Sequence, residues 1–158
     1  MSDNILNLDE MDDIISAVIK NDGKVSIIAS GVSMEPFIKN KKDVVTLVEA
    51  GRKLRKGDVP LYRRGNGKVV LHRVIGEDKN GYIMRGDNQW TNEYGIKDEN
   101  ILALLYSVKK GSREFKKDSA FCRLYEFFLP LIRLLKKSKN FIIIRAKRLR
   151  RSKNDKHS

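Results

Sequence analysis

Cysteine and histidine are scarce in this 158-residue chain, which has one cysteine, Cys122, and two histidines. One cysteine excludes an internal disulfide framework, and so few thiol and imidazole ligands make a structural zinc site unexpected. The sequence also lacks any uncharged apolar run near the roughly 20 residues that a membrane-spanning helix requires. Its acidic start lacks the basic and then apolar pattern of a secretory signal. These absences predict a cytoplasmic protein, with a peripheral position at the inner membrane surface left open.

Charge is unevenly distributed along the chain. Residues 1–108 contain 16 basic and 16 acidic residues, whereas residues 109–158 contain 17 basic and 4 acidic residues, which accounts for the whole net charge of +13. The sequence therefore predicts a neutral body followed by a strongly basic tail. A body without net charge disfavours the idea that the whole protein is a polycation for nucleic acid.

The first 23 residues have the apolar spacing of an amphipathic helix. Acidic residues lie toward its start, Lys20 lies at its end, and Asn21-Asp22-Gly23 is a typical stop signal. The apolar residues recur at steps of three and four: Ile5, Leu8, Met11, Ile14, Ile15, Val18 and Ile19.

Residues 24–110 are expected to form the main domain, with a mainly β fold. Short runs rich in β-branched and aromatic residues alternate with glycine-containing turns. Arg64–Lys68, with the sequence Arg-Gly-Asn-Gly-Lys, is typical of a hairpin turn. The predicted strands are Val25–Ser30, Asp43–Val48, Val59–Arg63, Lys68–Ile75, Tyr82–Arg85 and Ile101–Val108. We expect them to form one small, coiled, partly closed β-sheet.

Residues 111–158 form the basic amphipathic tail. Helical spacing of apolar residues runs over 120–135, with Pro130 expected to kink or interrupt the helix. Three interpretations remain open: residues 120–151 lie on an anionic membrane surface, the helix docks on the body, or the basic end contacts nucleic acid. The last is the weakest, because no recognised nucleic-acid-binding fold precedes the tail.

The segment Gly31–Pro36, with the sequence Gly-Val-Ser-Met-Glu-Pro, follows a predicted strand. Taken alone, a serine in a turn is usually only a turn residue. The pattern Gly-x-Ser-Met-x-Pro, however, resembles the nucleophile motif of the signal peptidase I family. The same motif occurs in the related self-cleaving SOS repressors and mitochondrial inner-membrane peptidases.

Three further motifs extend this resemblance in the family's order, over roughly Val25 to Val108. They are Gly57-Asp58, the sequence His-Arg-Val at His72–Val74, and Gly-Asp-Asn at Gly86–Asn88. The bacterial enzymes have lysine where this chain has His72, so the chain is similar to the histidine-type, endoplasmic-reticulum-like branch. The resemblance implies a fold of signal-peptidase type within residues 24–110.

The resemblance also implies a Ser/His/Asp site, with Ser33 as nucleophile, His72 as general base and Asp87 as the acid that supports the imidazole. An imidazole with a pKa near 6.5 can accept the serine proton at neutral pH, and a carboxylate on its far nitrogen would stabilise the imidazolium. Glu93 is the alternative acid and Asp98 a weaker third. Without the ordered motifs, His72 would be an ordinary strand histidine and Asp87 a turn residue.

The chain departs from the family pattern in three places. Gly31 stands where many signal peptidases have a serine that binds the oxyanion, and Lys42-Asp43 replaces a Gly-Asp pair. The family's N-terminal membrane anchor is also missing, which argues against housekeeping removal of secretory signals. Met34, Phe37 and Ile38 are expected either to pack in the core or to form a shelf for a bound peptide strand.

The sequence therefore predicts a serine endopeptidase that cleaves a peptide or pre-protein precursor and uses no metal or cofactor. The alternative is a non-catalytic protein on the same fold that binds peptides or a membrane-bound partner. A self-cleaving repressor is a weaker third hypothesis, because no helix-turn-helix precedes Val25.

Overall fold

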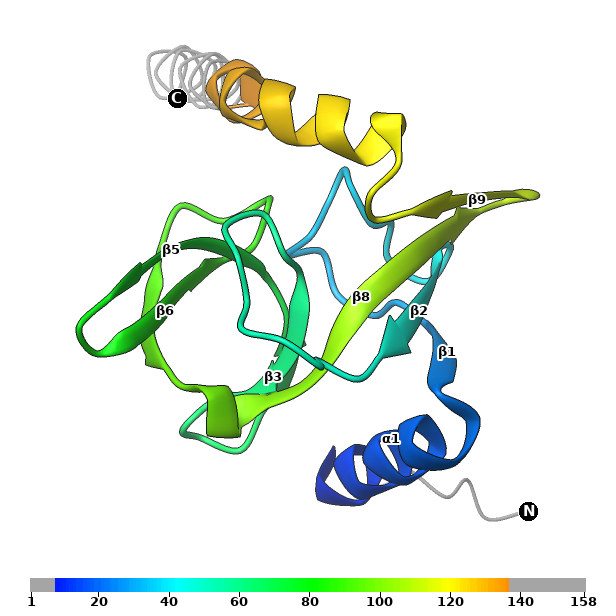
Figure 1. The fold of residues 1–158 in the computed structure, drawn as a ribbon. Helices are drawn as coiled ribbons and strands as arrows, with labels where there is room; N and C mark the ends of the chain where they lie inside the picture. Colours follow the sequence, from blue (N-terminus) through cyan, green and yellow to red (C-terminus); the bar gives the residue numbers. More distant parts are fainter. Residues whose placement is uncertain (1–7, 137–158) are drawn as a thin grey trace, which may run out of the picture. The chain divides into compact units, whose positions relative to one another are not determined.

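The computed structural model describes residues 8–136. Within them the protein is mainly β, with an N-terminal helix and a second helix over residues 120–136, as Figure 1 shows. The chain divides into two compact units between Arg123 and Leu124. All of the strands belong to the first unit.

Helix α1, Leu8–Asp22, confirms the predicted N-terminal helix. Ile15 and Ile19 are buried on one face, whereas Ile14 is 46% exposed, so the buried stripe is narrower than the apolar pattern implied. The helix ends at Gly23, which adopts a left-handed φ of 73° and donates its N–H to the Ile19 carbonyl at 2.8 Å.

The larger sheet has six strands, all paired antiparallel. Its order is β1 (Lys24–Ile28), β2 (Val44–Val48), β8 (Ile101–Lys110), β3 (Pro60–Arg63) and β4 (Val69–Leu71), with β9 (Arg113–Lys116) also paired to β8. The ten-residue β8 pairs with β3 near its start and with β2 and β9 near its end. The first and last strands in this order, β1 and β4, do not pair with each other, so the sheet does not close.

The smaller sheet has three strands: β5 (Arg73–Asp78), β6 (Gly81–Arg85) and β7 (Glu93–Ile96). A single turn of 3-10 helix, η1 (Asp98–Asn100), leads from it into β8. The expectation of one partly closed sheet was therefore wrong, because the strands divide between two open sheets. The predicted strand Lys68–Ile75 ends at Leu71 and resumes at Arg73, leaving His72 as the one residue between β4 and β5.

Two strands were not predicted. Strand β7 is short and contains Gly95 with a φ of 72°, so it lacks a clear alternating pattern. Strand β9 follows a turn at Gly111 and pairs with β8, so the sheet extends past the predicted boundary at residue 110. The Phe115 ring packs against Phe121, with centroids 4.3 Å apart.

The helix over residues 120–136 continues through Pro130 without the expected interruption. Among residues 8–136, no helix has both the length and the hydrophobicity needed to cross a membrane.

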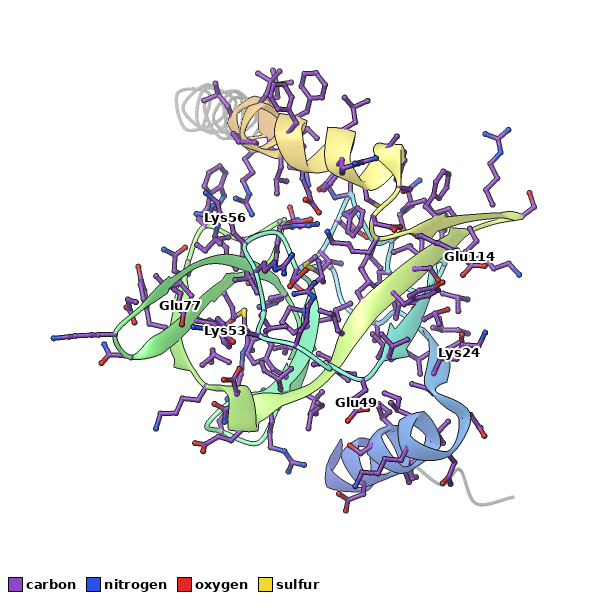
Figure 2. The ribbon with its side chains drawn as sticks, in the orientation of Figure 1. Lys24, Glu49, Lys53, Lys56, Glu77 and Glu114 are labelled. Atoms are coloured by element: carbon purple, nitrogen blue, oxygen red, sulfur yellow. The ribbon has the colours of Figure 1, made fainter. Side chains whose placement is uncertain are left out.

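A hydrophobic cluster lies between the smaller sheet and the loop and strand that precede it. Its buried members are Leu54, Tyr62, Val74, Tyr82, Met84 and Ile96. Lys53 and Glu77, both labelled in Figure 2, form an exposed ion pair at 2.6 Å. Because the cluster contains residues from β3 and from β5, β6 and β7, it holds the two sheets together.

Candidate active site

Ser33 lies in a turn that follows β1. Gly31 begins the turn with a φ of 97°, which glycine adopts without strain, and its N–H binds the Asn40 side chain at 3.0 Å. Three apolar residues after Ser33 are almost fully buried: Met34, Phe37 and Ile38. Their burial shows that they pack in the core and anchor the turn that carries Ser33, and Met34 and Ile38 also line the pocket beside it.

The Gly-Asp-Asn motif holds this turn directly. The backbone N–H of Asn88 donates to the Ser33 carbonyl at 2.8 Å, and its side-chain amide donates to the Val32 carbonyl at 3.0 Å. A Cβ on Gly86 would lie 2.6 Å from the Ser33 carbonyl oxygen, a distance at which atoms clash. Glycine is therefore required at 86 for the two segments to approach so closely.

His72 is only 1% exposed and lies where the chain passes from the larger to the smaller sheet. The backbone N–H of His72 donates to the Pro60 carbonyl at 3.4 Å. Two residues later, the backbone N–H of Val74 donates to the Asp58 carbonyl at 2.8 Å. The imidazole also packs edge-on against the Tyr62 ring. Backbone bonds on both sides of His72 therefore fix its position.

The acid beside the imidazole is Glu93. His72 Nδ1 lies 3.0 Å from Glu93 Oε1, and the Tyr62 hydroxyl lies 3.2 Å from the same nitrogen while donating to Glu93 Oε2 at 2.9 Å. Arg64 donates to both carboxylate oxygens, from Nε to Oε2 at 2.7 Å and from Nη2 to Oε1. This arrangement favours a proton on Nδ1, which leaves Nε2 as the basic nitrogen.

Asp87, the predicted supporting acid, has a different partner. Its two oxygens accept hydrogen bonds from Arg73, from Nε at 2.9 Å and from Nη2 at 2.8 Å. The third acid, Asp98, accepts a 2.6 Å hydrogen bond from the Tyr82 hydroxyl. The geometry therefore corrects the order of the candidates and places Glu93 first.

Arg73 links its own motif to the second and fourth motifs and to the residue that follows the nucleophile motif. Besides Asp87, its guanidinium binds the Gly57 carbonyl at 3.0 Å and lies 4.9 Å from the centre of the Phe37 ring. Phe37 follows the nucleophile motif, Gly57 belongs to the second motif and Asp87 to the fourth. Since Arg73 adjoins His72 and Asn88 adjoins Asp87, this network brings the Ser33 turn and the histidine into one region.

Burial and charge keep the proposed base neutral. Burial lowers the pKa of His72 below its usual 6.5, an effect that the Glu93 carboxylate opposes and the Arg64 cation reinforces. Burial alone would raise the pKa of Glu93, but hydrogen bonds from Arg64 and Tyr62 hold it below its usual 4.5. At neutral pH the site therefore contains a neutral imidazole beside an ionised carboxylate.

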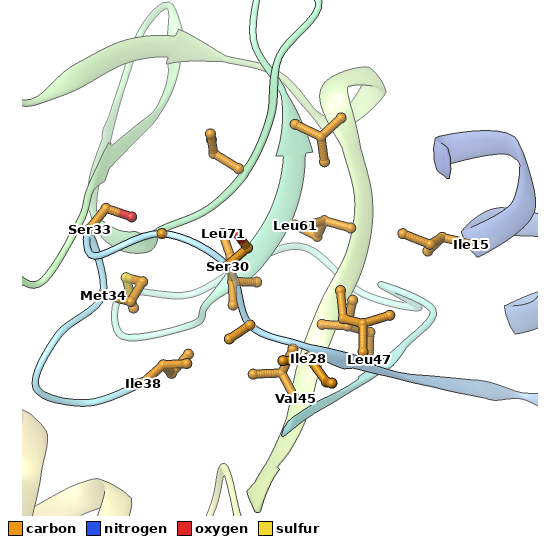
Figure 3. Close-up of a pocket in the computed structure, with 15 residues that line it drawn as sticks. Ile15, Ile28, Ser30, Ser33, Met34, Ile38, Val45, Leu47, Leu61 and Leu71 are labelled. Atoms are coloured by element: carbon orange, nitrogen blue, oxygen red, sulfur yellow. The ribbon is translucent and has the colours of Figure 1, made fainter. Parts of the chain in front are cut away.

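A pocket of about 300 Å³ lies beside the serine. In Figure 3 the Ser33 hydroxyl points toward the other residues that line the pocket. The lining is mainly apolar and comes from α1, β1, the Ser33 turn and strands β2, β3 and β4, including Ile15, Ile28, Met34, Val45, Leu61 and Leu71. The site therefore adjoins a space that can receive an apolar side chain.

Ser33 and His72 are not joined by a direct hydrogen bond. Within residues 8–136, none of the hydrogen bonds joins the serine hydroxyl to the imidazole. Catalytic hydrogen bonds are often long in unliganded sites and shorten when substrate binds. The part of the chain that the structure describes also has no group of three or more metal-binding side chains.

Sequence reasoning missed Tyr62, Arg64 and the central role of Arg73. Tyr62 could have been found from the hairpin, because Tyr62 pairs with Val70 and the residue two positions on is His72. Diagonal neighbours of this kind share one face of a sheet. The link from Arg64 to Glu93 depends on the unpredicted strand β7, so no local signal reveals it.

Comparison with known proteins adds no relative: no protein-family model matches the chain, and no curated protein matches it significantly.

Proposed function

We propose that the protein is a serine endopeptidase with a fold of signal-peptidase type, in which Ser33 is the nucleophile and His72 the general base. The observation that carries this proposal is the buried imidazole with Glu93 3.0 Å from Nδ1. The second support is the set of contacts made by Arg73 and Asn88, which together connect the four motifs. Glu93 replaces Asp87 as the acid that orients the ring.

In the proposed reaction, Ser33 Oγ attacks the carbonyl carbon of the scissile peptide bond while His72 Nε2 accepts its proton. The tetrahedral intermediate collapses as the imidazolium returns this proton to the leaving amine, which forms an acyl-enzyme. Water then attacks the ester with His72 again accepting a proton, and the acid product leaves as Ser33 is regenerated. Glu93 stabilises the imidazolium in both steps.

The oxyanion requires donors beside Ser33. Because Gly31 and Ser33 belong to one tight turn, the Ser33 backbone N–H is the donor that the geometry favours. The hydrogen bond from the Asn88 backbone N–H to the Ser33 carbonyl fixes the orientation of the peptide units in the turn. A fixed donor stabilises developing charge without having to reorganise during the reaction.

The substrate is proposed to be an extended peptide segment. Strands β1 and β4 are the two ends of the larger sheet's strand order, and both contribute to the pocket beside Ser33. A sheet edge can pair with an added strand, and alternate side chains then enter pockets. The apolar lining predicts a small or medium apolar side chain next to the scissile bond.

Cleavage of a diverse synthetic peptide library, followed by mass spectrometry, tests the proposal. Wild-type protein is expected to produce new termini at a consistent sequence, and Ser33→Ala to produce none. Ser26→Ala is the matched control, since Ser26 is another β1-region serine whose hydroxyl binds Thr46 at 2.9 Å and does not line the pocket.

Two results would overturn the assignment. Equal cleavage by wild type and Ser33→Ala would remove Ser33 from the mechanism, and loss of cleavage in Ser30→Ala alone would assign the nucleophile to that neighbouring pocket residue. Saturable peptide binding without cleavage by the wild type would support the non-catalytic alternative instead.

A further inference from the structure

The helix over residues 120–136 presents large apolar side chains to solvent. Phe127 is 76% exposed, and six other residues of this helix are between 41% and 59% exposed: Phe121, Leu124, Phe128, Leu131, Leu134 and Leu135. We call these seven residues the apolar face. Monomeric soluble proteins seldom expose contiguous apolar surface of this kind unless it binds something.

The apolar face is one side of a regular amphipathic pattern. Cys122 and Leu129 are buried, seven residues apart, and the residues of intermediate exposure fall at matching helical steps: Tyr125, Glu126, Ile132, Arg133 and Lys136. Phenylalanine and leucine therefore dominate the exposed side of the helix, whereas the charged residues Glu126, Arg133 and Lys136 are intermediate in exposure and Arg123 is exposed.

Charge indicates what the apolar face binds. From residue 127 to residue 154 the sequence contains ten basic and no acidic residues. Leucine and phenylalanine next to many cations are the composition of helices that lie in the interface of an anionic bilayer. A second copy of the chain would bring two such basic segments together, and like charges disfavour that contact.

We propose that the apolar face docks on the surface of an anionic phospholipid membrane, to which the basic composition of the sequence from residue 127 onward adds electrostatic attraction. The apolar side chains enter the boundary between headgroups and acyl chains, and the helix lies in the membrane plane. This interaction is independent of the proposed catalysis, since neither Ser33 nor His72 takes part. It would hold the pocket beside Ser33 near substrates at the same surface.

Cosedimentation of the full-length protein with vesicles tests the proposal. We expect binding to mixed phosphatidylcholine–phosphatidylglycerol vesicles at low salt, much weaker binding to pure phosphatidylcholine, and a decrease as salt screens the charges. The double variant Phe127→Glu/Leu131→Glu should weaken binding by about tenfold or more, because it removes two apolar contacts and adds two negative charges.

The matched control is Tyr94→Glu, which changes an aromatic residue that is 61% exposed on β7. It should bind vesicles within about twofold of wild type, since a single charge added outside the apolar face has little effect when screened. Both variants alter exposed positions, and circular dichroism is expected to show unchanged folding.

Three results would overturn the proposal. The first is equal binding to neutral and anionic vesicles, or no binding to either. The second is a concentration-dependent dimer that the double variant abolishes while vesicle binding is absent, which would assign the apolar face to a second copy. The third is RNA binding at the same salt without vesicle binding. Absence of vesicle binding by the wild-type protein, together with normal peptide cleavage, would reject the membrane proposal and leave the peptidase proposal intact.

Discussion

Two carboxylates near His72 occupy contrasting regions of the site. Asp87 is 1% exposed and bound by the guanidinium of Arg73, which is itself buried. The Glu93 side chain is 23% exposed and lies against the imidazole nitrogen. Each carboxylate is bound by an arginine, so the arginine contacts do not distinguish the roles of the two acids. Their positions differ: Asp87 links the motifs through Arg73, whereas Glu93 lies against Nδ1 of the imidazole and is the acid that the proposed reaction uses.

The largest predicted effect concerns the Asp87 region. Asp87→Ala leaves the Arg73 guanidinium buried without its carboxylate, so the free energy of unfolding should fall by about 3–5 kcal/mol. Urea denaturation followed by circular dichroism measures this change. The control Glu77→Ala breaks the exposed pair with Lys53 and should cost less than about 1 kcal/mol. Equal losses in the two variants would mean that the buried pair has no special structural role.

The next effect concerns the Glu93 region. Glu93→Gln keeps the size of the side chain but removes the charge that stabilises the imidazolium, so modification of Ser33 by a fluorophosphonate should slow by roughly 10²- to 10⁴-fold. Intact-protein mass spectrometry measures the rate. If Asp87→Asn stays folded and slows labelling while Glu93→Gln does not, the assignment of the two acids is reversed.

A smaller effect is expected at Gly86, the glycine next to Asp87 that packs against the Ser33 turn. Gly86→Ala places a methyl group where the Ser33 carbonyl now lies, so the turn must move at a cost of about 1–3 kcal/mol. We expect slower fluorophosphonate labelling of Ser33 with only a modest loss of stability. Gly76→Ala is the control, because its Cβ would meet only the Ile83 side chain, at 3.8 Å. Unchanged labelling in Gly86→Ala would show that the turn accommodates the methyl group.

The smallest effect is a shift in pH dependence. In the proposed mechanism, labelling of Ser33 requires neutral His72, so its rate should rise with pH through a midpoint below 6.5 and then become constant. Because the Glu93 charge raises the pKa of His72, Glu93→Gln should move the midpoint lower still. A midpoint that does not move, measured over the same pH range, would contradict direct coupling of the two groups.

The same pKa directions predict the pH dependence of stability. Both pKa values are lowered in the folded protein, so the folded state binds fewer protons than the unfolded chain. Stability should therefore be lost as pH falls from 6.5 through the folded pKa of His72, and again below 4.5 through that of Glu93. Thermal unfolding at several pH values measures this loss.

Much of the fold follows from local patterns, whereas the site follows only in part. The spacing around Ile15 and Ile19 predicts α1, and the glycine-rich sequence after Arg64 predicts the β3–β4 hairpin, because both signals act over a few residues. The choice between Asp87 and Glu93 depends on how β7 pairs with β6. That pairing is irregular and β7 is four residues long, so hydrophobic alternation carries little information about it.

The single residue between β4 and β5 makes the site sensitive to chain length. Side chains alternate between the two faces of a strand, so deleting or inserting one residue next to His72 would reverse the facing of every residue up to the next irregularity. The imidazole and the guanidinium of Arg73 would then exchange directions, and Glu93 would face a cation in place of a base. Evolution and protein engineering can therefore vary the tip of this hairpin, around Asn66, far more freely than its stem.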